Sequence, residues 1–453
     1  MTTRDALGRL AAPAVFLATT LWVTGAAAQA TLATRPTTVA DAVAVALRQN
    51  PDALSSESRV RGAEADRSGV NGGFYPRLRV DANVTQWNGP FAISFPLPIP
   101  GAPPGGAAFS VRNALTWSAS ASLIQPVTRL WQIYDEYKVQ DLGVDVAEIK
   151  RLVTRRELAF EVVQAYYRLL EAQRLTEVAR TSVTQLEAQQ REAQSLFDNG
   201  VIGKNDLLRV GLALASAKQR EIQMRGGVVL GCGQLATLMG EPPGTAIDAE
   251  PFTGAPPGLE EPSVEAAEVR AAAQRLEVRE LDRSMEQADH GVAAAKKKLI
   301  PQVDVIGNYT HFDGAQFQQE NAAYVGLFAS WDVWDWGTTT SGISSANAKL
   351  DQARIARRKL EAQVRLEARQ AFVNAETARD ALGVARTAVS QAEENFRIVT
   401  KKFDAAAATS FDVVDAEALL TQARGQVETG LYDLLIARAA LARATGTALP
   451  GEK

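Results

Sequence analysis

Four segments of the chain alternate between apolar and polar side chains, as strands with one apolar face do. In the first, apolar residues occupy the even positions from Leu78 to Val84, and polar residues occupy the odd positions from Arg79 to Thr85. A period of two over about ten residues is typical of a barrel strand. The second segment repeats this pattern clearly, and the last is the least regular. We expect strands at about 77–88, 113–126, 302–311 and 323–334.

Two other segments carry apolar residues spaced four and three apart, which predicts long helices with one continuous seam. The pattern runs unbroken from Val364 to Phe403, and it recurs from Leu158 to Phe197 with only Thr176 and Gln190 as polar exceptions. Alanine dominates the seam, so each helix needs close neighbours on more than one side. The first long helix, from about residue 133 to 198, would extend about 100 Å. We expect helical hairpins at about 133–240 and 340–446, with turns at 199–205 and 404–410.

The two halves of the chain resemble each other. Tyr75-Pro76 and the strand after it match Ile300-Pro301, 225 positions later, whereas Phe197-Asp198 matches Phe403-Asp404 at a distance of 206. The first half therefore holds additional residues, and the proline- and glycine-rich segment from Pro96 to Gly106 accounts for them. We predict a first repeat at 31–240, a Pro/Gly-rich linker at 241–262, a second repeat at 263–446 and a C-terminal tail at 447–453.

The first thirty residues have the features of a secretory signal peptide. Arg4 and Arg9 precede an apolar run from Leu10 to Val23, and Ala28-Gln29-Ala30 offers a cleavage site between small residues. No later stretch is long and uncharged enough for a transmembrane helix. The expected mature chain therefore is either periplasmic or enters an outer membrane as strands.

Composition excludes several classes of function. The net charge is −4, and no basic run with interleaved aromatic residues indicates nucleic-acid binding. Cys232 is the only cysteine, so no intrachain disulfide can form, and we expect it to be a packed core residue. His290 and His311 are the only histidines and lack metal-ligand spacing. Because no nucleophile motif, P-loop or CxxC is present either, we predict no catalytic residues, no metal and no cofactor.

Tryptophan placement favours a membrane over a soluble sandwich. Tryptophan prefers the membrane–water interface, where its ring is buried and its N–H stays hydrated. Four strands cannot close a barrel, and an open strand edge cannot face lipid. Three copies would bring about twelve strands, an even number within the known range. All tryptophans outside the signal lie in or beside the predicted strands, and we assign them to the interface: Trp87, Trp117, Trp131, Trp331, Trp334 and Trp336.

Two strand–loop–strand and long-hairpin repeats behind a signal peptide resemble the TolC-like outer-membrane efflux protein family. The matching pieces are Ile300-Pro301-x-Val303 before a strand, Asp335-Trp336-Gly337 after one, and the tip Phe197-x-x-Gly200-x-x-x-x-x-Asp206-Leu207-Leu208. The resemblance implies a homotrimer in the outer membrane of a Gram-negative bacterium, with a twelve-stranded β-barrel (four strands per protomer) continuing into a periplasmic α-helical barrel. It also implies a passive channel for tripartite efflux or type I secretion, without enzymatic activity.

The resemblance further implies partners and a site at the hairpin tips. The tips would contact a periplasmic adaptor and an inner-membrane pump of the RND or ABC type. An acidic constriction at the periplasmic entrance would consist of Asp412 and Asp415, with Asp206 as the counterpart in the first repeat. Asp412 alone is also explained as a helix cap in Thr409-x-x-Asp412. The expected adaptor-contacting tips are Gly200, Val201, Ile202, Gly203, Ala406, Ala407 and Ala408.

This sequence departs from some family members at one tip position, where Ala408 replaces an arginine that helps to lock the entrance. Lys204, in the other tip, is an alternative lock. Two other functions fit parts of the sequence. A periplasmic adaptor has a long hairpin and a signal peptide, but normally one hairpin, and a soluble coiled-coil scaffold explains the helices without the strands. Drug, metal and polypeptide exporters share the architecture, so the residues leave the cargo, the partner pump and the resting state of the entrance open.

Overall fold

A computed structural model describes residues 37–95, 107–254, 256, 258, 261–405 and 407–452. The chain divides into two units, Met1–Arg35 and Pro36–Lys453, and the description below concerns the second unit. The signal peptide expected at 1–30 and the Pro/Gly-rich segment 96–106 lie outside the described residues.

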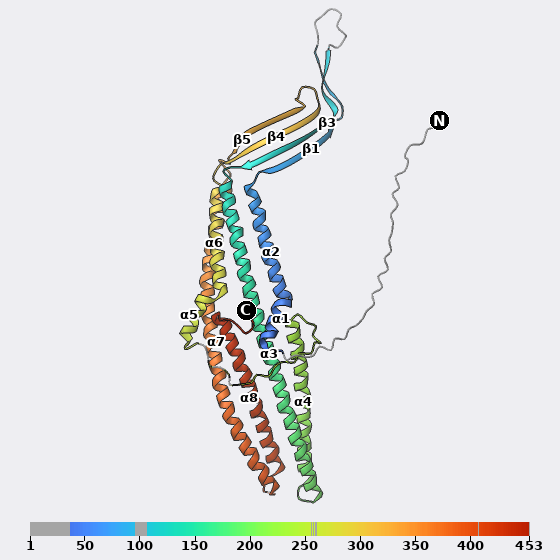
Figure 1. Cartoon of the computed structure of the whole chain (residues 1–453), viewed down its shortest axis with the longest axis vertical. Coiled ribbons are helices and arrows are strands. Elements are labelled where there is room, and N and C mark those ends of the chain that lie inside the picture. The colour runs from blue at the N-terminus through green and yellow to red at the C-terminus, as the bar shows by residue number, and fades with distance from the viewer. Residues whose placement is uncertain are drawn as a thin grey trace, which may run out of the picture. The chain divides into compact units, whose positions relative to one another are not determined.

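The elements of the described residues follow one order twice, namely two helices, antiparallel strands and two helices, and the first series adds a 3-10 helix and a third strand (Figure 1). The first series is α1 (Val39–Gln49), α2 (Pro51–Asn71), the short 3-10 helix η1 (Gly72–Phe74), β1 (Arg77–Gln86), β2 (Phe91–Phe95), β3 (Ala107–Pro126), α3 (Leu130–Asp198) and α4 (Lys204–Leu238). The second is α5 (Val264–Gln274), α6 (Leu276–Lys297), β4 (Gln302–Ala315), β5 (Asn321–Ser330), α7 (Thr338–Asp404) and α8 (Ser410–Thr445).

The two series correspond residue by residue at the distances found in the sequence. Helices α1 and α5 begin at Val39 and Val264, which are 225 positions apart. The breaks that follow them, at Asn50 and Arg275, have the same separation and nearly the same backbone angles. On the other side of the strands, α4 and α8 begin at Lys204 and Ser410, 206 positions apart. The duplication therefore includes the short helices that precede each strand pair.

One antiparallel sheet contains the strands in the order β1-β3-β4-β5, with β2 paired to β3 off this path. The pairing between β3 and β4 joins the two repeats. The sheet has one strand more than the four expected, because β3 continues beyond β1 and its first residues pair with Phe91–Phe95. Strand β5 ends at Ser330, four residues before its predicted end, so Trp334 lies in a loop. Ser330 pairs with Gln302, the first residue of β4, so the pairing of these two strands ends there.

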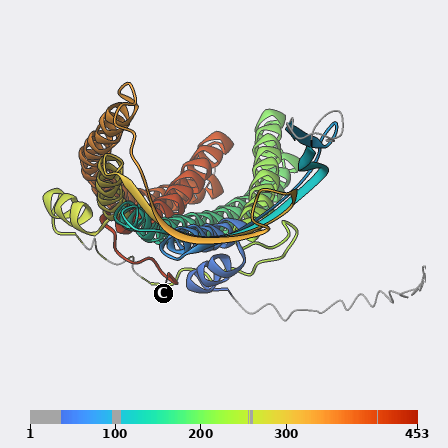
Figure 2. The ribbon, with the colours of Figure 1, turned by 90° about the horizontal axis from the view of Figure 1, so that it is seen from above.

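The sheet lies at one end of the unit, and the long helices extend away from it (Figure 1). Viewed from above, the helices and the sheet follow one arc (Figure 2). Helices α1 and α5 lie on the convex side of that arc, roughly midway along the long helices. Among the described helices, none combines the length and the apolar composition that a bilayer crossing requires.

Helix α3 runs for 69 residues without a break because it contains no proline and only one glycine, Gly143. The predicted seam is its packed face, since Leu158, Val162, Leu169 and Leu186 are all buried. The corresponding seam of α7 buries residues from Val364 to Ala385, together with Phe403.

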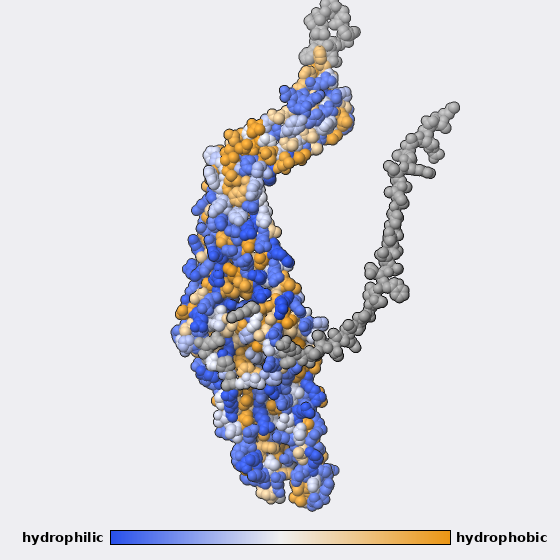
Figure 3. All heavy atoms as spheres, viewed as in Figure 1, coloured by the Kyte–Doolittle hydropathy of each residue, from blue (hydrophilic) through white to orange (hydrophobic). Residues whose placement is uncertain are grey.

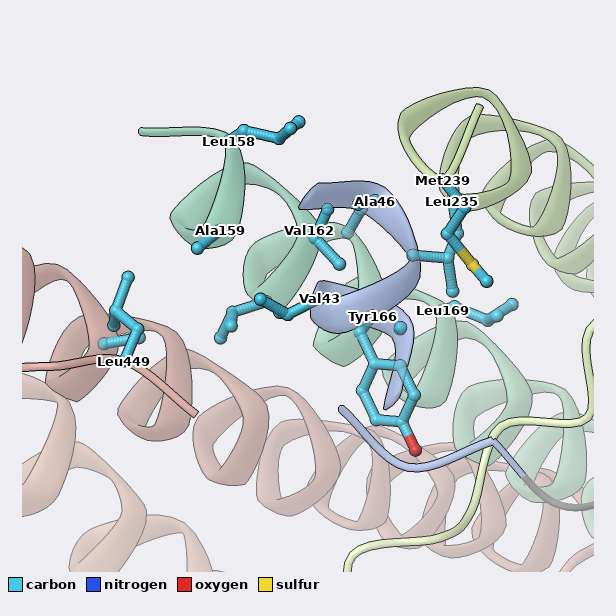
Figure 4. Close-up of a cluster of buried hydrophobic side chains, with 14 of the residues drawn as sticks. Val43, Ala46, Leu158, Ala159, Val162, Tyr166, Leu169, Leu235, Met239 and Leu449 are labelled. Carbon is cyan, nitrogen blue, oxygen red and sulfur yellow. The ribbon is translucent and has the colours of Figure 1, made fainter. Parts of the chain in front are cut away.

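The largest apolar core lies where α1, the linker and the C-terminal tail pack against α3 (Figure 4). Val43, Leu235 and Leu449 reach this core from three different parts of the chain. The hydroxyl of Tyr166 lies within hydrogen-bond distance of the carbonyl oxygens of Thr37 and Glu250, at 2.9 and 3.0 Å, and its one proton is shared between them. Burial raises the pKa of Tyr166 to about 12. This core holds the N-terminal segment and the linker to the long helices. Cys232 packs half-buried against it, as predicted for that residue.

Candidate functional site

The first hairpin tip, residues 199–203, joins α3 to α4. Gly200 has a φ of +75°, a left-handed conformation that glycine adopts at little cost. Its N–H donates to Phe197, and the N–H of Val201 donates to Leu196, both at 2.9 Å. These bonds satisfy the last carbonyls of α3. Gly203 precedes α4 without a side-chain cap, and Val201 is exposed at the tip.

The second tip, residues 405–409, uses a different device. Thr409 and Asp412 form a capping box at the start of α8. The N–H and the hydroxyl of Thr409 donate to one carboxylate oxygen of Asp412, at 2.8 and 2.7 Å. These two donors lower the pKa of Asp412 below its usual value, the backbone N–H more than the hydroxyl. Ala407 donates to the carbonyl of Lys402, and Ala406 lies outside the described residues.

The two tips contact each other. The hydroxyl of Ser410, the buried first residue of α8, donates to the carboxylate of Asp206 on α4 at 2.7 Å. The next residue, Phe411, has its ring 5.0 Å from the guanidinium carbon of Arg209 on α4. The first turns of α4 and α8 are therefore held together by a charge-assisted hydrogen bond and a cation–π contact.

The structure brings two of the three predicted entrance carboxylates into local contacts. Asp412 caps α8, as the alternative explanation for that residue predicted, and Asp206 accepts from Ser410. Asp415 lies one turn further along α8, is exposed, and has no ion pair among the described residues. Lys204, the first residue of α4, is also exposed.

Contacts that sequence reasoning missed link α3 to α8 above the tips. Glu417 on α8 is 1 % exposed, and its carboxylate accepts from Ser182 on α3 at 2.5 Å and from Thr421 at 2.7 Å. Closer to the sheet, Arg168 on α3 pairs with Asp433 on α8 at 2.9 Å. Ser182 and Glu417 were not recognisable in the sequence, because only the packing of distant helices brings them together. Helical spacing nevertheless gave a signal, since Glu417 lies four residues after Val413 and three before Leu420, on the face that α8 buries.

The six predicted interface tryptophans occupy two levels of the described structure. Trp87 and Trp117 lie toward the end of the sheet away from the helices, and their indole N–H groups donate to Thr116 and Asp313. Trp131 is in the first turn of α3, and the remaining three lie between β5 and α7, where apolar residues gather on the surface (Figure 3). At about 3.3 Å per residue, β1 spans about 33 Å. A tilt of about 40° would reduce this to about 25 Å, the height of an outer-membrane apolar band.

The histidines have ordinary packing roles. The ring of His290 lies 3.2 Å from buried Asp135, and the ring of His311 lies tilted against Trp117 with centroids 4.8 Å apart. Within the described residues, no group of histidine, cysteine and acidic side chains is arranged to hold a metal ion.

Comparison with known proteins agrees with the geometry. The family model described as "Outer membrane efflux protein" matches residues 42–241 and 269–447, which cover both repeats. No curated protein sequence matches the chain.

Solved structures share its fold. The outer-membrane channel OprN is 19% identical, with 90% of each chain covered and a TM-score of 0.77. The outer membrane protein VceC of Vibrio cholerae is 16% identical, with 90% of this chain and 96% of that chain covered and a TM-score of 0.75. The CmeC outer membrane channel of Campylobacter jejuni is 15% identical, with 90% and 85% covered and a TM-score of 0.75.

Proposed function

The chain belongs to the outer membrane efflux protein family, and on this premise we propose that three copies form a passive channel across the outer membrane and the periplasm. An inner-membrane pump supplies the energy, and a periplasmic adaptor connects that pump to the hairpin tips. The family match covers both repeats, which favours the channel over a one-hairpin adaptor or a soluble scaffold.

The single observation that carries the proposal is the open arc of the protomer. Its sheet ends on both sides in a strand, β1 or β5, that has only one partner within the described residues. Both strands expose apolar side chains, including Leu78, Val84 and Leu327. Open edges cannot remain in lipid, because each unpaired backbone group would cost several kcal/mol. Three copies closing edge to edge bury these edges, and the path β1-β3-β4-β5 of each copy then contributes to a barrel of about twelve strands.

The length of the helices supports a span across the periplasm. Helix α3 has 69 residues, which corresponds to about 100 Å at 1.5 Å per residue. It runs from the sheet to the first tip, so a channel anchored in the outer membrane would present its tips about that far below it. Substrate would enter between the tips and leave through the barrel.

Electron microscopy of the full chain, extracted in detergent without partners, tests the assembly. We expect three-fold particles with a short belt inside the micelle and a stalk on the order of 100 Å. Monomeric or compact particles outside the micelle would contradict the channel.

The proposal also assigns the entrance to Asp412 and Asp415. They lie three residues apart on α8, and Asp415 has no competing ion pair among the described residues. In a trimer they would form a ring of about six carboxylates, which attracts cations and holds a narrow aperture under charge repulsion. The hydrogen bond from Ser410 keeps Asp206 on α4 beside this ring.

Divalent-cation block in planar bilayers tests this entrance. Asp412→Asn with Asp415→Asn removes the charge and retains an oxygen that can cap α8. We expect the half-blocking concentration to rise on the order of tenfold, which corresponds to about 1.4 kcal/mol. The matched control is Asp198→Asn with Asp404→Asn, at the exposed ends of α3 and α7, which should leave block unchanged. Equal effects of the two double variants would remove the entrance assignment.

A further inference from the structure

The two repeats meet inside each chain along β3 and β4, in a defined antiparallel register. Leu123 stands opposite Gly307, Gln125 opposite Val305 and Pro126 opposite Asp304. Beyond the strand, the N–H of Val127 donates to the carbonyl of Val303 at 2.9 Å. This is how the second strand of one repeat contacts the first strand of the other.

The same kind of contact is missing at the two free edges, β5 and β1. Strand β5 is the second strand of its repeat and β1 is the first strand of its own, so they correspond to β3 and β4. Each β3 position corresponds to the β5 position 206 residues later, and each β4 position to the β1 position 225 residues earlier. The proposed assembly would bring β5 of one copy beside β1 of the next.

The geometry points to one register for this contact, and the inference rests on the proposed trimer: β5 and β1 of neighbouring copies pair as β3 and β4 do. Transferring Leu123–Gly307 places Ala329 opposite Ala82 of the next copy. By the same transfer, Leu327 stands opposite Val84, and Trp331 opposite Val80.

The faces of the two strands agree with this register, although the side-chain pattern was not used to derive it. It brings the apolar even positions of β1 onto the apolar odd positions of β5, so one face of the sheet stays apolar across the copies. A slip of one residue would place the polar side chains of Arg79, Asp81 and Asn83 beside apolar odd positions of β5. Slips of two residues keep the faces matched and must be excluded by other contacts.

Charge complementarity disfavours those slips. The pair Pro126–Asp304 transfers to Asp332 and Arg79 of the next copy, which places opposite charges directly across the strands. A slip of two residues would instead place Arg79 opposite Ser330 or Trp334. Arg79 already pairs with Asp81 on its own strand at 2.9 Å, so Asp332 would add a second carboxylate.

The register also explains why β5 is short. Residues Gln125 and Pro126 pair with β4 alone, because β1 begins opposite Ile124. Their counterparts, Trp331 and Asp332, can pair only with another copy. We therefore expect β5 to lengthen by these two residues on assembly, and the N–H of Val333 to donate to Leu78 of the next copy, as Val127 does to Val303.

A cavity beside the loop that follows β5 is left open by the described residues of the chain. A cavity of about 450 Å³ lies between residues 298–302 and residues 330–340. In the first repeat, Ile133 packs 3.5 Å from where a Cβ on Gly73 would stand, and Gln125 donates to the carbonyl of Phe74. Trp336 in the second loop has a φ of +53°, which is uncommon for a bulky side chain. The cavity is expected of a loop whose neighbouring strand comes from another copy.

Disulfide cross-linking of the full chain tests the register. In a Cys232→Ala background, Ala82→Cys with Ala329→Cys places two thiols on directly opposed positions. Opposed Cα atoms lie about 4.5–5.5 Å apart, within the range that a disulfide bridges, whereas diagonal neighbours are about 7–8 Å apart and lie beyond it. After mild oxidation in the membrane, we expect covalent dimers and trimers on a non-reducing denaturing gel.

Two further pairs test slipped registers, and one pair is the matched control. Ala82→Cys with Leu327→Cys, or with Trp331→Cys, should cross-link poorly. Leu123→Cys with Gly307→Cys occupies the equivalent position inside the chain, so it should lose its free thiols without forming a ladder. Stronger ladders from either slipped pair would overturn the register while leaving the trimer in place. If no pair forms a ladder while the internal control is oxidised, the edge contact itself is wrong, and three-fold particles in the microscope would show that the channel proposal survives.

A charge reversal provides a second measurement. Arg79→Asp and Asp332→Arg should each lower the temperature at which the trimer dissociates in detergent, and the double variant should recover part of that loss. The expected shifts are small, because exposed ion pairs contribute little. Additive losses in the double variant would contradict direct contact between the two residues.

Discussion

Helices α3 and α7 are repeat counterparts of nearly equal length, 69 and 67 residues, with the same seam spacing, yet they are buried differently. On α3, Phe160 and Val178 are half-buried. Their counterparts on α7, Leu366 and Val384, are 54% and 72% exposed. Among the described elements, α3 packs against α1, α2, α4, α6 and α8, whereas α7 packs against α5, α6 and α8.

The difference shows that the spacing of apolar residues determines a helix and one packed face. The position of the helix in the arc determines how many of its faces are covered by neighbours. Helix α4, on the opposite flank, also exposes a row of apolar residues, including Leu212, Ile222 and Leu230. In the proposed trimer, α7 of one copy would meet α4 of the next. The apolar residues on the flanks would then be covered, as the seam of α3 already is.

The largest expected effect comes from shortening a buried side chain on α3. Leu169→Ala removes a fully buried side chain, which should lower the free energy of unfolding by about 2–5 kcal/mol. Denaturant titration in detergent, followed by circular dichroism, measures this. Leu366→Ala on α7 is the matched change at an exposed position. It should mainly lower the temperature at which the trimer dissociates, and an equal loss in protomer unfolding would break the comparison.

A smaller effect is expected at the link between α3 and α8. Glu417→Ala leaves the buried hydroxyl of Ser182 without its acceptor, which costs about 1–3 kcal/mol in unfolding free energy. Glu417→Gln retains an acceptor of the same size and should lose less. The repeat counterparts of Ser182 and Glu417 are Ala388 and Gly211, so the link has no equivalent between α7 and α4. If the two variants were equally destabilising, the hydrogen bond would not be the cause.

Strain at the first tip should be smaller again. Gly200→Ala forces a left-handed backbone onto alanine, at about 1 kcal/mol, and a Cβ there meets no other atom. Hydrogen exchange of the Val201 amide, which donates to Leu196, should become about fivefold faster. Gly200→Asn is the control, because asparagine tolerates this conformation. The same acceleration in both variants would argue against backbone strain.

The smallest effect is the pH dependence of the second tip. The pKa of Asp412 is lowered from 3.8 when its carboxylate accepts from Thr409, so the cap contributes fully above pH 3.8 and is lost as the pH falls through the lowered pKa. Amide protection at the start of α8, corrected for intrinsic exchange, should decline below about pH 3.8. Thr409→Ala, which removes the hydroxyl, should weaken this step. A step at higher pH would show that the cap does not stabilise the carboxylate.

Much of the fold was predictable because it depends on short-range patterns. Period two marked the strands around Val80 and Ala121, and spacings of four and three marked α3 and α7. The sequence could not reveal β2, a five-residue strand that forms only because β3 extends past β1. It also overextended the last strand to Trp334, because alternation continues beyond the point where β5 has a partner. At the tips, the cap at Asp412 was recognisable, since Thr409 lies three residues away.

The sequence by itself determined the duplication, the long helices and the face that each one buries, because these follow from periodicity within one segment. Only the tertiary structure decided that Ser410 reaches Asp206, that Glu417 reaches Ser182, and that α3 is covered while α7 is not. Those outcomes depend on which helices lie side by side, and residues more than 200 positions apart carry no local signal of each other. The open edges of the sheet depend on both. The repeat in the sequence defines β1 as the counterpart of β4 and β5 as the counterpart of β3, and the fold leaves one edge of each without a partner among the described residues.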